Sequence, residues 1–371
     1  MALIALAVLA ATRMGPGWPV LARPARLPLL LAGLVFAAWL PSLPGSLNVA
    51  VSAGTMARVA LLVAGGVLLW SFLTARPELT RSLNKVFLVG MIAAGLFVLA
   101  ASTVAPALVA FRTHGTPNPA LQFKASASVF ACAFPVVIYA GWRLGGRWRA
   151  AALVAVVLGL FAIQATHSRS GLAGLLIAIG VALLLLAGHR FGRRIGAALW
   201  AAAIAIPTAA LGWMVSRPLE IWHGPYAERV PAWVIDPHRQ VIWQFVFDQF
   251  LERPWFGWGI NTINESPGAH EGIPGLGAEF VPSHPHSWLL QILSETGVIG
   301  FLPTLAVVVG VGVVAALAWN RHPTPQRLAW LLLWCAFWMS SAFNFSFWAA
   351  WWQTAAVLLA VLVLAPDGEA E

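Results

Sequence analysis

Long apolar runs recur along this chain and decide the solvent in which it can fold. Most of them approach the roughly 20 residues that a helix needs to cross the hydrocarbon layer of a membrane. Chains that span lipid are helical or form closed barrels, and barrel strands would alternate in hydropathy. The runs therefore predict an all-α, polytopic transmembrane helical bundle of about eleven spans, near 2–12, 27–40, 56–74, 86–110, 123–142, 149–166, 170–187, 195–215, 297–319, 327–344 and 347–365.

Composition excludes an ordinary water-soluble fold. Of the 371 residues, 60% are hydrophobic and 9% are charged, with a mean hydropathy of +0.81, whereas soluble domains carry roughly 25% charged residues. Residues 2–12 resemble a signal peptide, but no charged segment precedes them and arginines follow, so we expect a first span. Cys132 and Cys335 fall within apolar spans, where a thiol usually acts as a small packing residue, so we infer no disulfide or metal from them.

The positions of the basic residues indicate the topology of the chain in the membrane. The formal net charge of +9 is spread over short loops and does not gather on one soluble face, which disfavours nucleic acid as a partner. The basic residues fall in every second loop, as the positive-inside rule requires of the cytoplasmic side: Arg13/Arg23/Arg26, Arg76/Arg81/Lys85, Arg143/Arg147/Arg149, Arg190/Arg193/Arg194 and Arg321/Arg327. We therefore expect the N-terminus and residues 216–285 outside, and the C-terminal tail in the cytoplasm.

Acidic residues and histidines gather in that outer segment. Apart from Glu78, no Asp or Glu precedes Glu220, and more than half of the nine histidines lie between 216 and 286. Polar groups concentrated outside the spans indicate a site that faces water or the headgroups. We expect three regions: 1–215 with transmembrane helices one to eight, 216–285 as an outer loop with an amphipathic helix at 238–252, and 286–371 with helices nine to eleven and a short tail.

A transporter or channel is the alternative from a different class. Transporters usually place ionisable residues at mid-depth and carry paired broken helices in related halves, and neither feature is visible here. The chain also has no GxxxxGK[ST] phosphate loop and no internal repeat. These observations disfavour a transporter, and nothing in the sequence indicates nucleotide-driven work.

The outer segment contains an expected helix at HRQVIWQFVFDQFLE, residues 238–252, with Val241, Phe245 and Leu251 on its apolar side. Arg239 and Trp243 are four residues apart and should share a face. The turn RPWFGWGINT and a polar loop, 263–283, follow and could close over a ligand. HPHSWLLQILSETGVIGF then predicts a helix that begins after Pro285, places His286 at its outer end and breaks near Gly297.

Three strings in order resemble a known family: HSRSGLAG (167–174), HRQVIW followed by RPWFGWGINT, and HSWLLQILSETGVIG (286–300). Each is common alone, but together they resemble the O-antigen ligase and polymerase superfamily, most closely O-antigen ligase, over roughly the second half of the chain. The resemblance implies eleven or twelve spans in the bacterial inner membrane. It also implies transfer of a glycan from undecaprenyl pyrophosphate at the periplasmic face, either to lipid A-core oligosaccharide or, in a polymerase, onto carrier-linked repeats.

The resemblance also implies roles for three residues. Arg169 and Arg239 match the two functional arginines, and His286 matches the motif histidine, although His-Ser at 286–287 departs from the commoner His-Asn. A planar guanidinium binds phosphate oxygens in pairs, so two arginines could take the place of a metal on a leaving pyrophosphate. The plainer alternatives are an interfacial anchor for Arg169 and a solvated charge, paired with Asp236 or a lipid phosphate, for Arg239.

His286 could accept a proton from the acceptor hydroxyl or orient it, because imidazole titrates near ambient pH. A histidine at a helix start can equally be satisfied by water, and His284 is expected to be secondary. A metal held by His284 and His286 with Glu271 or Glu279 is conceivable, but a Pro-rich H-x-H turn is weak support. We expect no metal and no cofactor.

Aromatic residues in the outer segment are expected mainly as anchors at the membrane interface. Trp243 and Trp258 are the two that we assign to the substrate, as rings on which a sugar can stack. The resemblance thus implies a membrane glycosyltransferase that inverts the anomeric centre. Its expected partners are a lipid-linked glycan donor, a lipid A-core acceptor and membrane lipids, with no nucleic acid.

Overall fold

A computed structural model describes residues 23–104, 122–216, 220–221, 227–228, 235–273 and 277–366. The expected span at 2–12 and the end of the 86–110 run lie outside these residues, as do Arg217 and Arg229. The helices are α2 Arg23–Trp39, α3 Val49–Ala75, α4 Pro77–Thr103, α7 Lys124–Leu144, α8 Arg147–Ala165, α9 Arg169–Phe191, α10 Arg193–Ser216, α11 Pro237–Glu252, α12 Trp288–Arg321, α13 Pro325–Ser341 and α14 Ala350–Leu364. Short 3-10 turns lie at Leu40–Ser42 and Ile263–Glu265, and β1 (Glu220–Ile221) pairs antiparallel with β2 (Ala227–Glu228).

The prediction of an all-α polytopic bundle is confirmed. Every expected span that falls on described residues coincides with a helix, and six of these helices are long and apolar enough to cross a membrane: α3, α4, α7, α8, α9 and α12. Their outward side chains are largely leucine, valine and phenylalanine, for example Leu96, Leu153 and Leu176, which are more than half exposed. The protein is therefore a multi-pass membrane protein, because such surfaces require lipid.

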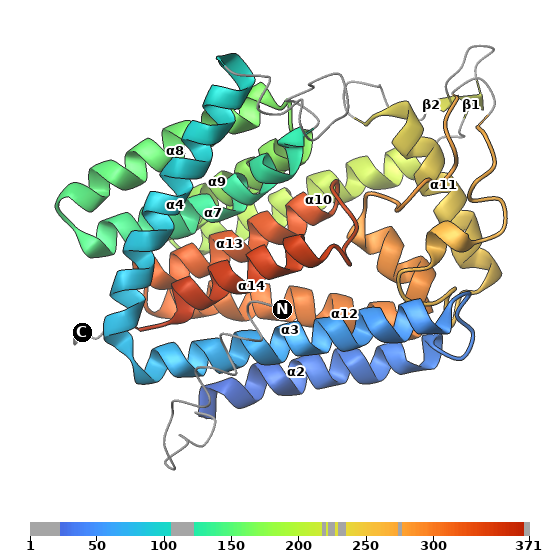
Figure 1. Cartoon of the computed structure of the whole chain (residues 1–371), viewed down its shortest axis with the longest axis horizontal. Helices are drawn as coiled ribbons and strands as arrows, with labels where there is room; N and C mark the ends of the chain where they lie inside the picture. Colours follow the sequence, from blue (N-terminus) through green and yellow to red (C-terminus); the bar gives the residue numbers. More distant parts are fainter. Residues whose placement is uncertain are drawn as a thin grey trace.

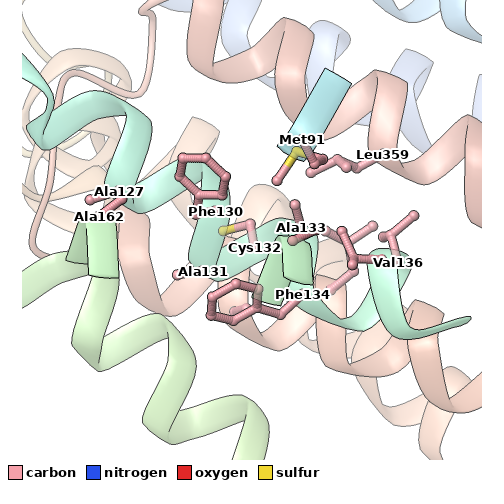
Figure 2. Close-up of a cluster of buried hydrophobic side chains, with 14 of the residues drawn as sticks. Met91, Ala127, Phe130, Ala131, Cys132, Ala133, Phe134, Val136, Ala162 and Leu359 are labelled. Atoms are coloured by element: carbon pink, nitrogen blue, oxygen red, sulfur yellow. The ribbon is translucent and has the colours of Figure 1, made fainter. Parts of the chain in front are cut away.

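Helix α7 lies at the centre of one half of the bundle. Its residues Phe130 to Val137 are all buried. Figure 2 shows this helix between Met91 of α4, Ala162 of α8 and Leu359 of α14. A helix that is apolar on all sides has no solvent face and packs among other helices. Lys124, the first residue of α7, lies at one end of this buried helix and is itself only partly buried.

The remaining helices form a second group beside α7. Helices α2, α3, α12, α13 and α14 run side by side in Figure 1, with α11 and its loops at one end. Helix α13 also packs on α7 and α9, and so joins the two groups. The loop segments around α11 therefore lie over one end of a single helical bundle.

Helix α12 is kinked at Gly297, as expected, and the kink is filled by the turn at 254–259. Gly297 has φ +61°, and a Cβ there would lie 2.2 Å from the carbonyl carbon of Trp255. Four backbone hydrogen bonds join the two segments, including Trp258 N to Ser294 O at 3.0 Å and Val298 N to Pro254 O at 2.8 Å. Glycine is required because the left-handed backbone and the close approach both exclude a side chain. The SETGVIG string therefore fixes the outer turn onto the membrane helix.

The helix expected at 238–252 is α11, and of its expected apolar residues Val241 is buried and Phe245 packs within the outer segment. Ile242 and Val246 are buried against Trp258, Ile263 and Val281, whereas Leu251 is 57% exposed. The alternation of apolar and polar residues could not reveal that the following loop covers this helix. One face of α11 is therefore committed to packing within the outer segment.

Candidate functional site

Three cations meet where three helices begin. Lys124 is the first residue of α7, Arg169 is the first of α9, and Arg239 lies in the first turn of α11. Each of the three charges acts on the other two. The first N–H groups of a helix have no partner within it and carry a partial positive charge. The arrangement therefore concentrates positive charge at the outer end of the bundle, as an anion-binding site requires.

The HSRSG string holds Arg169 against the start of α7. The Ser168 hydroxyl caps α9 by accepting from Gly171 N at 3.2 Å, and the Ser170 hydroxyl lies 3.3 Å from that of Ser128. A Cβ on Gly171 would approach the carbonyl oxygen of Ala127 to 3.2 Å. Small residues thus let α9 begin beside the first turn of α7. This close approach brings Arg169 to Lys124.

Arg239 is held by a backbone carbonyl across the site. Its Nη1 donates to the carbonyl oxygen of Phe343, which follows α13, at 2.8 Å. Burial lowers the pKa of the guanidinium, the Asp236 carboxylate opposes this shift, and Arg169 adds to it. An arginine nevertheless remains charged at any physiological pH. Asp236 also caps α11 by accepting from His238 N at 3.0 Å. A partly desolvated cation of this kind binds a phosphate more strongly than one in water.

The His284 and His286 rings lie together beside these cations. Their centroids are 4.2 Å apart, and His286 adopts φ +55°, which is rare outside glycine. Among the described residues, neither His286 Nδ1 nor His284 Nε2 has a hydrogen-bond partner, although both atoms are buried. The other ring nitrogen of His284, Nδ1, lies 2.8 Å from the Ser283 hydroxyl. Two buried ring nitrogens are thus left to bind a group that the described residues do not supply.

Both histidines are neutral at physiological pH. Burial lowers the pKa of His286 to about 3, with further lowering by His284, Arg239 and Lys124, and a hydrogen bond to the Asn344 carbonyl opposes the shift. Burial and Arg239 lower the pKa of His284 to about 4. Since Nδ1 of His286 lacks a partner, Nε2 is the nitrogen that donates to Asn344. Nδ1 then carries a lone pair and can accept a proton or a hydrogen bond.

The two tryptophans assigned to the substrate lie in different places. Trp243 Nε1 donates to the carbonyl oxygen of Pro285 at 2.8 Å, and its ring contacts Phe343, so it stands beside Arg239 as expected. Trp258 is only 4% exposed, donates to Gln249 O at 2.7 Å and is covered by the Arg253 guanidinium at 3.8 Å. A sugar could stack on Trp258 only after this packing had opened.

A cavity of about 440 Å³ adjoins the cation cluster. It lies at the turn between α8 and α9 and is lined by Ile163, Gln164, His167, Ser168, Arg169 and Leu172. His167 has φ +48°, so this turn is held in an unfavourable backbone conformation. The lining is polar at Arg169 and apolar at Leu172, which suits a ligand with a charged group attached to a hydrocarbon chain.

Lys124 is the residue that the sequence interpretation missed. It carries the same signal as Arg169, a basic residue at the outer end of a span and thus on the side opposite to the topology-setting charges. Only the packing of α7 against α9, together with the effects of Arg239 and Arg169 on the charge of Lys124, reveals that this residue belongs to the site.

Glu279 of the outer segment is engaged away from the site. The Glu279 carboxylate lies 2.7 Å from His270 Nδ1, and its backbone oxygen lies 3.0 Å from His238 Nε2. The part of the chain that the structure describes contains no group of three His, Cys, Asp or Glu side chains spaced to hold a metal ion. Ser287 is buried at the start of α12 and makes no side-chain cap there.

Two comparisons relate this sequence to known proteins. Residues 154–305 match a family model described as O-Antigen ligase, and this stretch includes Arg169, Arg239 and His286. The resemblance to the O-antigen ligase superfamily is confirmed. A protein of Rickettsia conorii with the provisional name polysaccharide ligase is 26% identical over 129 residues, which cover 34% of this chain and 31% of that protein. The chain thus matches less than a third of that relative's length.

Proposed function

We propose that this protein transfers a glycan from undecaprenyl pyrophosphate to lipid A-core oligosaccharide at the periplasmic face of the bacterial inner membrane. The observation that carries the proposal is the meeting of Lys124, Arg169 and Arg239 beside two histidines with unpaired ring nitrogens. The family match supports a role in glycan transfer for lipopolysaccharide biosynthesis. The carrier, the acceptor and the membrane side are our inference.

The cation cluster suits a pyrophosphate leaving group. In the proposed reaction an acceptor oxygen attacks the anomeric carbon, and the bond from that carbon to the phosphate oxygen breaks. The negative charge that develops on the pyrophosphate is stabilised by Arg169 and Arg239, with Lys124 as a third cation. Because these charges are fixed before the reaction, the stabilisation needs no reorganisation when the bond breaks. Direct displacement of this kind inverts the anomeric centre, which linkage analysis of the product would test.

His286 is proposed to receive the acceptor proton. A neutral imidazole with a free lone pair on Nδ1 is the form that can do so. A pKa of about 3 makes the ring a weak base in the empty site. A bound pyrophosphate would oppose the positive field of Arg239 and Lys124 and so raise the pKa of His286. Donor binding would thus prepare the base, and His284 would contact the glycan or the pyrophosphate from the neighbouring position.

Two other functions stay as alternatives. A polymerase would use the same donor site and join the glycan to another carrier-linked repeat. A transporter is less consistent with the site, because Lys124, Arg169 and Arg239 lie where their helices begin and not at the middle of a span. The three functions give different products from one assay.

The assay uses purified protein in detergent with an undecaprenyl-pyrophosphate glycan and lipid A-core, and products are separated on gels. We expect a lipid A-linked product from the wild type and its loss in His286→Ala and Arg169→Ala. Longer carrier-linked chains without lipid A labelling would identify a polymerase instead. Absence of either product, together with glycan uptake in proteoliposomes, would support a transporter.

A further inference from the structure

The segment between α13 and α14 holds both the proposed base and one of the proposed cations. The carbonyl oxygen of Phe343 accepts from Arg239, and the carbonyl oxygen of Asn344 accepts from the ring of His286. Both acceptors belong to the backbone. The positions of Arg239 and His286 therefore depend on the backbone path of residues 342–349. The side chains of Phe343 and Asn344 do not set these positions.

Gln291 of α12 holds this segment. Its Oε1 accepts from Phe347 N at 2.8 Å and from the Ser346 hydroxyl at 3.2 Å. Its Nε2 lies 3.0 Å from the same hydroxyl and donates to Glu295 Oε1 at 3.3 Å. Gln291 is only 1% exposed. Three of these four hydrogen bonds hold residues 346 and 347 against α12.

Glu295, one turn further along α12, joins the segment to the outer turn. Its Oε2 accepts from the indole N–H of Trp348 and, at 2.8 Å, from the backbone N–H of Asn261, and the backbone N–H of Ile263 also donates to the carboxyl group. The side chain is fully buried, with 0% exposed. A buried carboxyl group is tolerated only when donors surround it. Glu295 thus ties α12, the turn after Trp258 and the 342–349 segment to one point.

We propose that Gln291 and Glu295 act as a positioning pair that sets Arg239 and His286 in the geometry needed for glycan transfer. Neither residue faces the reacting atoms, and both act through the backbone of Phe343 and Asn344. The inference rests on the proposed function of the site. A displacement of about 1 Å in a reacting group can cost on the order of a hundredfold in rate, so a loosened segment should lower kcat.

The decisive test is a substitution whose effect on kcat a second substitution should reverse. In Glu295→Gln, the new amide keeps an oxygen for Asn261 and Trp348 but turns its NH2 toward the NH2 of Gln291. Two donors then face one another. The double variant Gln291→Glu with Glu295→Gln places a carboxyl group at 291, which accepts from Phe347 N, from Ser346 and from the new amide. Every donor has an acceptor again.

The measurements are kcat per amount of folded protein, the donor KM, the pH dependence of kcat, and the melting temperature. We expect Glu295→Gln to lower kcat about tenfold or more and the double variant to recover to within about threefold of the wild type. The matched control is Gln326→Leu, which removes a 2.8 Å bond to Val363 O between α13 and α14, away from the site. We expect this control to lower the melting temperature without changing kcat.

Each outcome of these measurements tests either the positioning role or the proposed function. An active wild type whose Glu295→Gln variant keeps the same kcat and pH profile per folded protein would overturn the positioning role and leave the proposed function intact. Failure of the double variant to recover, despite a wild-type melting temperature, would also overturn it. An inactive wild type would instead contradict the proposed function.

Discussion

Two polar clusters lie next to one another at the outer end of this protein, and they differ in how completely they are paired. Around Glu295 each side-chain oxygen and nitrogen of the positioning pair meets a partner within the fold. Around His286 two ring nitrogens are buried without partners among the described residues, and three cations act on one another. The first cluster is complete in itself, whereas the second has two ring nitrogens that the described residues leave without partners.

The difference shows which groups lower the stability of the folded protein. Unpaired buried nitrogens and adjacent like charges are each unfavourable, and the positive φ of His286 adds local strain. The paired cluster holds these groups in place through the 342–349 segment. A protein that only needed a stable fold would have no use for the second cluster. We therefore interpret it as the site of chemistry.

The largest expected effect is the loss of kcat when an unpaired histidine is replaced, compared with the replacement of a paired one. His286→Ala should lower kcat by about a hundredfold to a thousandfold, in the range that loss of a general base produces. His270→Ala, which removes a histidine bonded to Glu279, should leave kcat close to that of the wild type. Single-turnover transfer assays would measure both. Equal effects of the two substitutions would break the distinction between the clusters.

A second comparison concerns two arginines of the outer segment. Arg253 donates to Gly45 O at 2.8 Å and covers Trp258, so its role is in packing. Arg239→Lys should lower kcat by about tenfold to a hundredfold, because a lysine cannot bind phosphate oxygens in pairs. Arg253→Lys should change the melting temperature more than kcat. A larger loss of kcat from the Arg253 variant would contradict the assignment.

Lys124 gives a smaller expected effect, because its charge supports the site without a planar fork. Lys124→Gln should raise the donor KM about tenfold, the value of one charge-assisted contact of roughly 1.4 kcal/mol, while Lys124→Arg should come close to the wild type. Lys85→Gln is the control, since Lys85 lies in the first half of α4 and is not among the charges that act on Lys124, Arg239, His284 or His286. Steady-state kinetics at constant ionic strength would reveal the difference.

The histidines also predict how stability depends on pH. Their pKa values, about 4 for His284 and about 3 for His286, lie below the ordinary 6.5. As pH falls through 6.5 the unfolded chain binds protons that the folded chain does not, so stability decreases from about pH 6.5 down to about pH 3. Melting temperatures between pH 7.5 and 4.5 should fall less steeply for His284→Asn combined with His286→Asn. An unchanged slope would contradict the neutral, buried state of both rings.

The smallest expected effect is that of a chelator. If the cations perform the work that a metal does in other lipid-linked glycosyltransferases, EDTA should leave transfer unchanged. Activity lost in EDTA and restored by Mg²⁺ or Zn²⁺ would mean that arginines alone do not stabilise the leaving group. The same gel assay measures this outcome.

Much of the fold could be predicted because apolar runs of membrane length leave a chain few choices. The expected helices at 123–142 and 170–187 coincide with α7 and α9, and the break at Gly297 was visible as a glycine within an apolar run. The membrane forces backbone groups to pair within a helix, so hydropathy alone defines these elements. Helix faces were less predictable, as α11 demonstrates.

The candidate site was only partly visible for a related reason. Arg169, Arg239 and His286 belong to motifs, and their meeting follows from the order of the helices. Lys124 and the carbonyl oxygens of Phe343 and Asn344 carry no motif of their own. Their roles arise from contacts between segments more than a hundred residues apart along the chain, for example between Arg239 and Phe343. Such contacts depend on tertiary packing, which no local pattern specifies.

The central claim is that the cation cluster binds a pyrophosphate, and equilibrium binding tests it most directly. The purified protein in nanodiscs would be titrated with undecaprenyl pyrophosphate and with undecaprenyl monophosphate. We predict a lower Kd for the pyrophosphate in the wild type and loss of this preference in Arg239→Ala and Lys124→Gln. Equal affinity for the two lipids in the wild type, or a preference that survives both substitutions, would contradict the account.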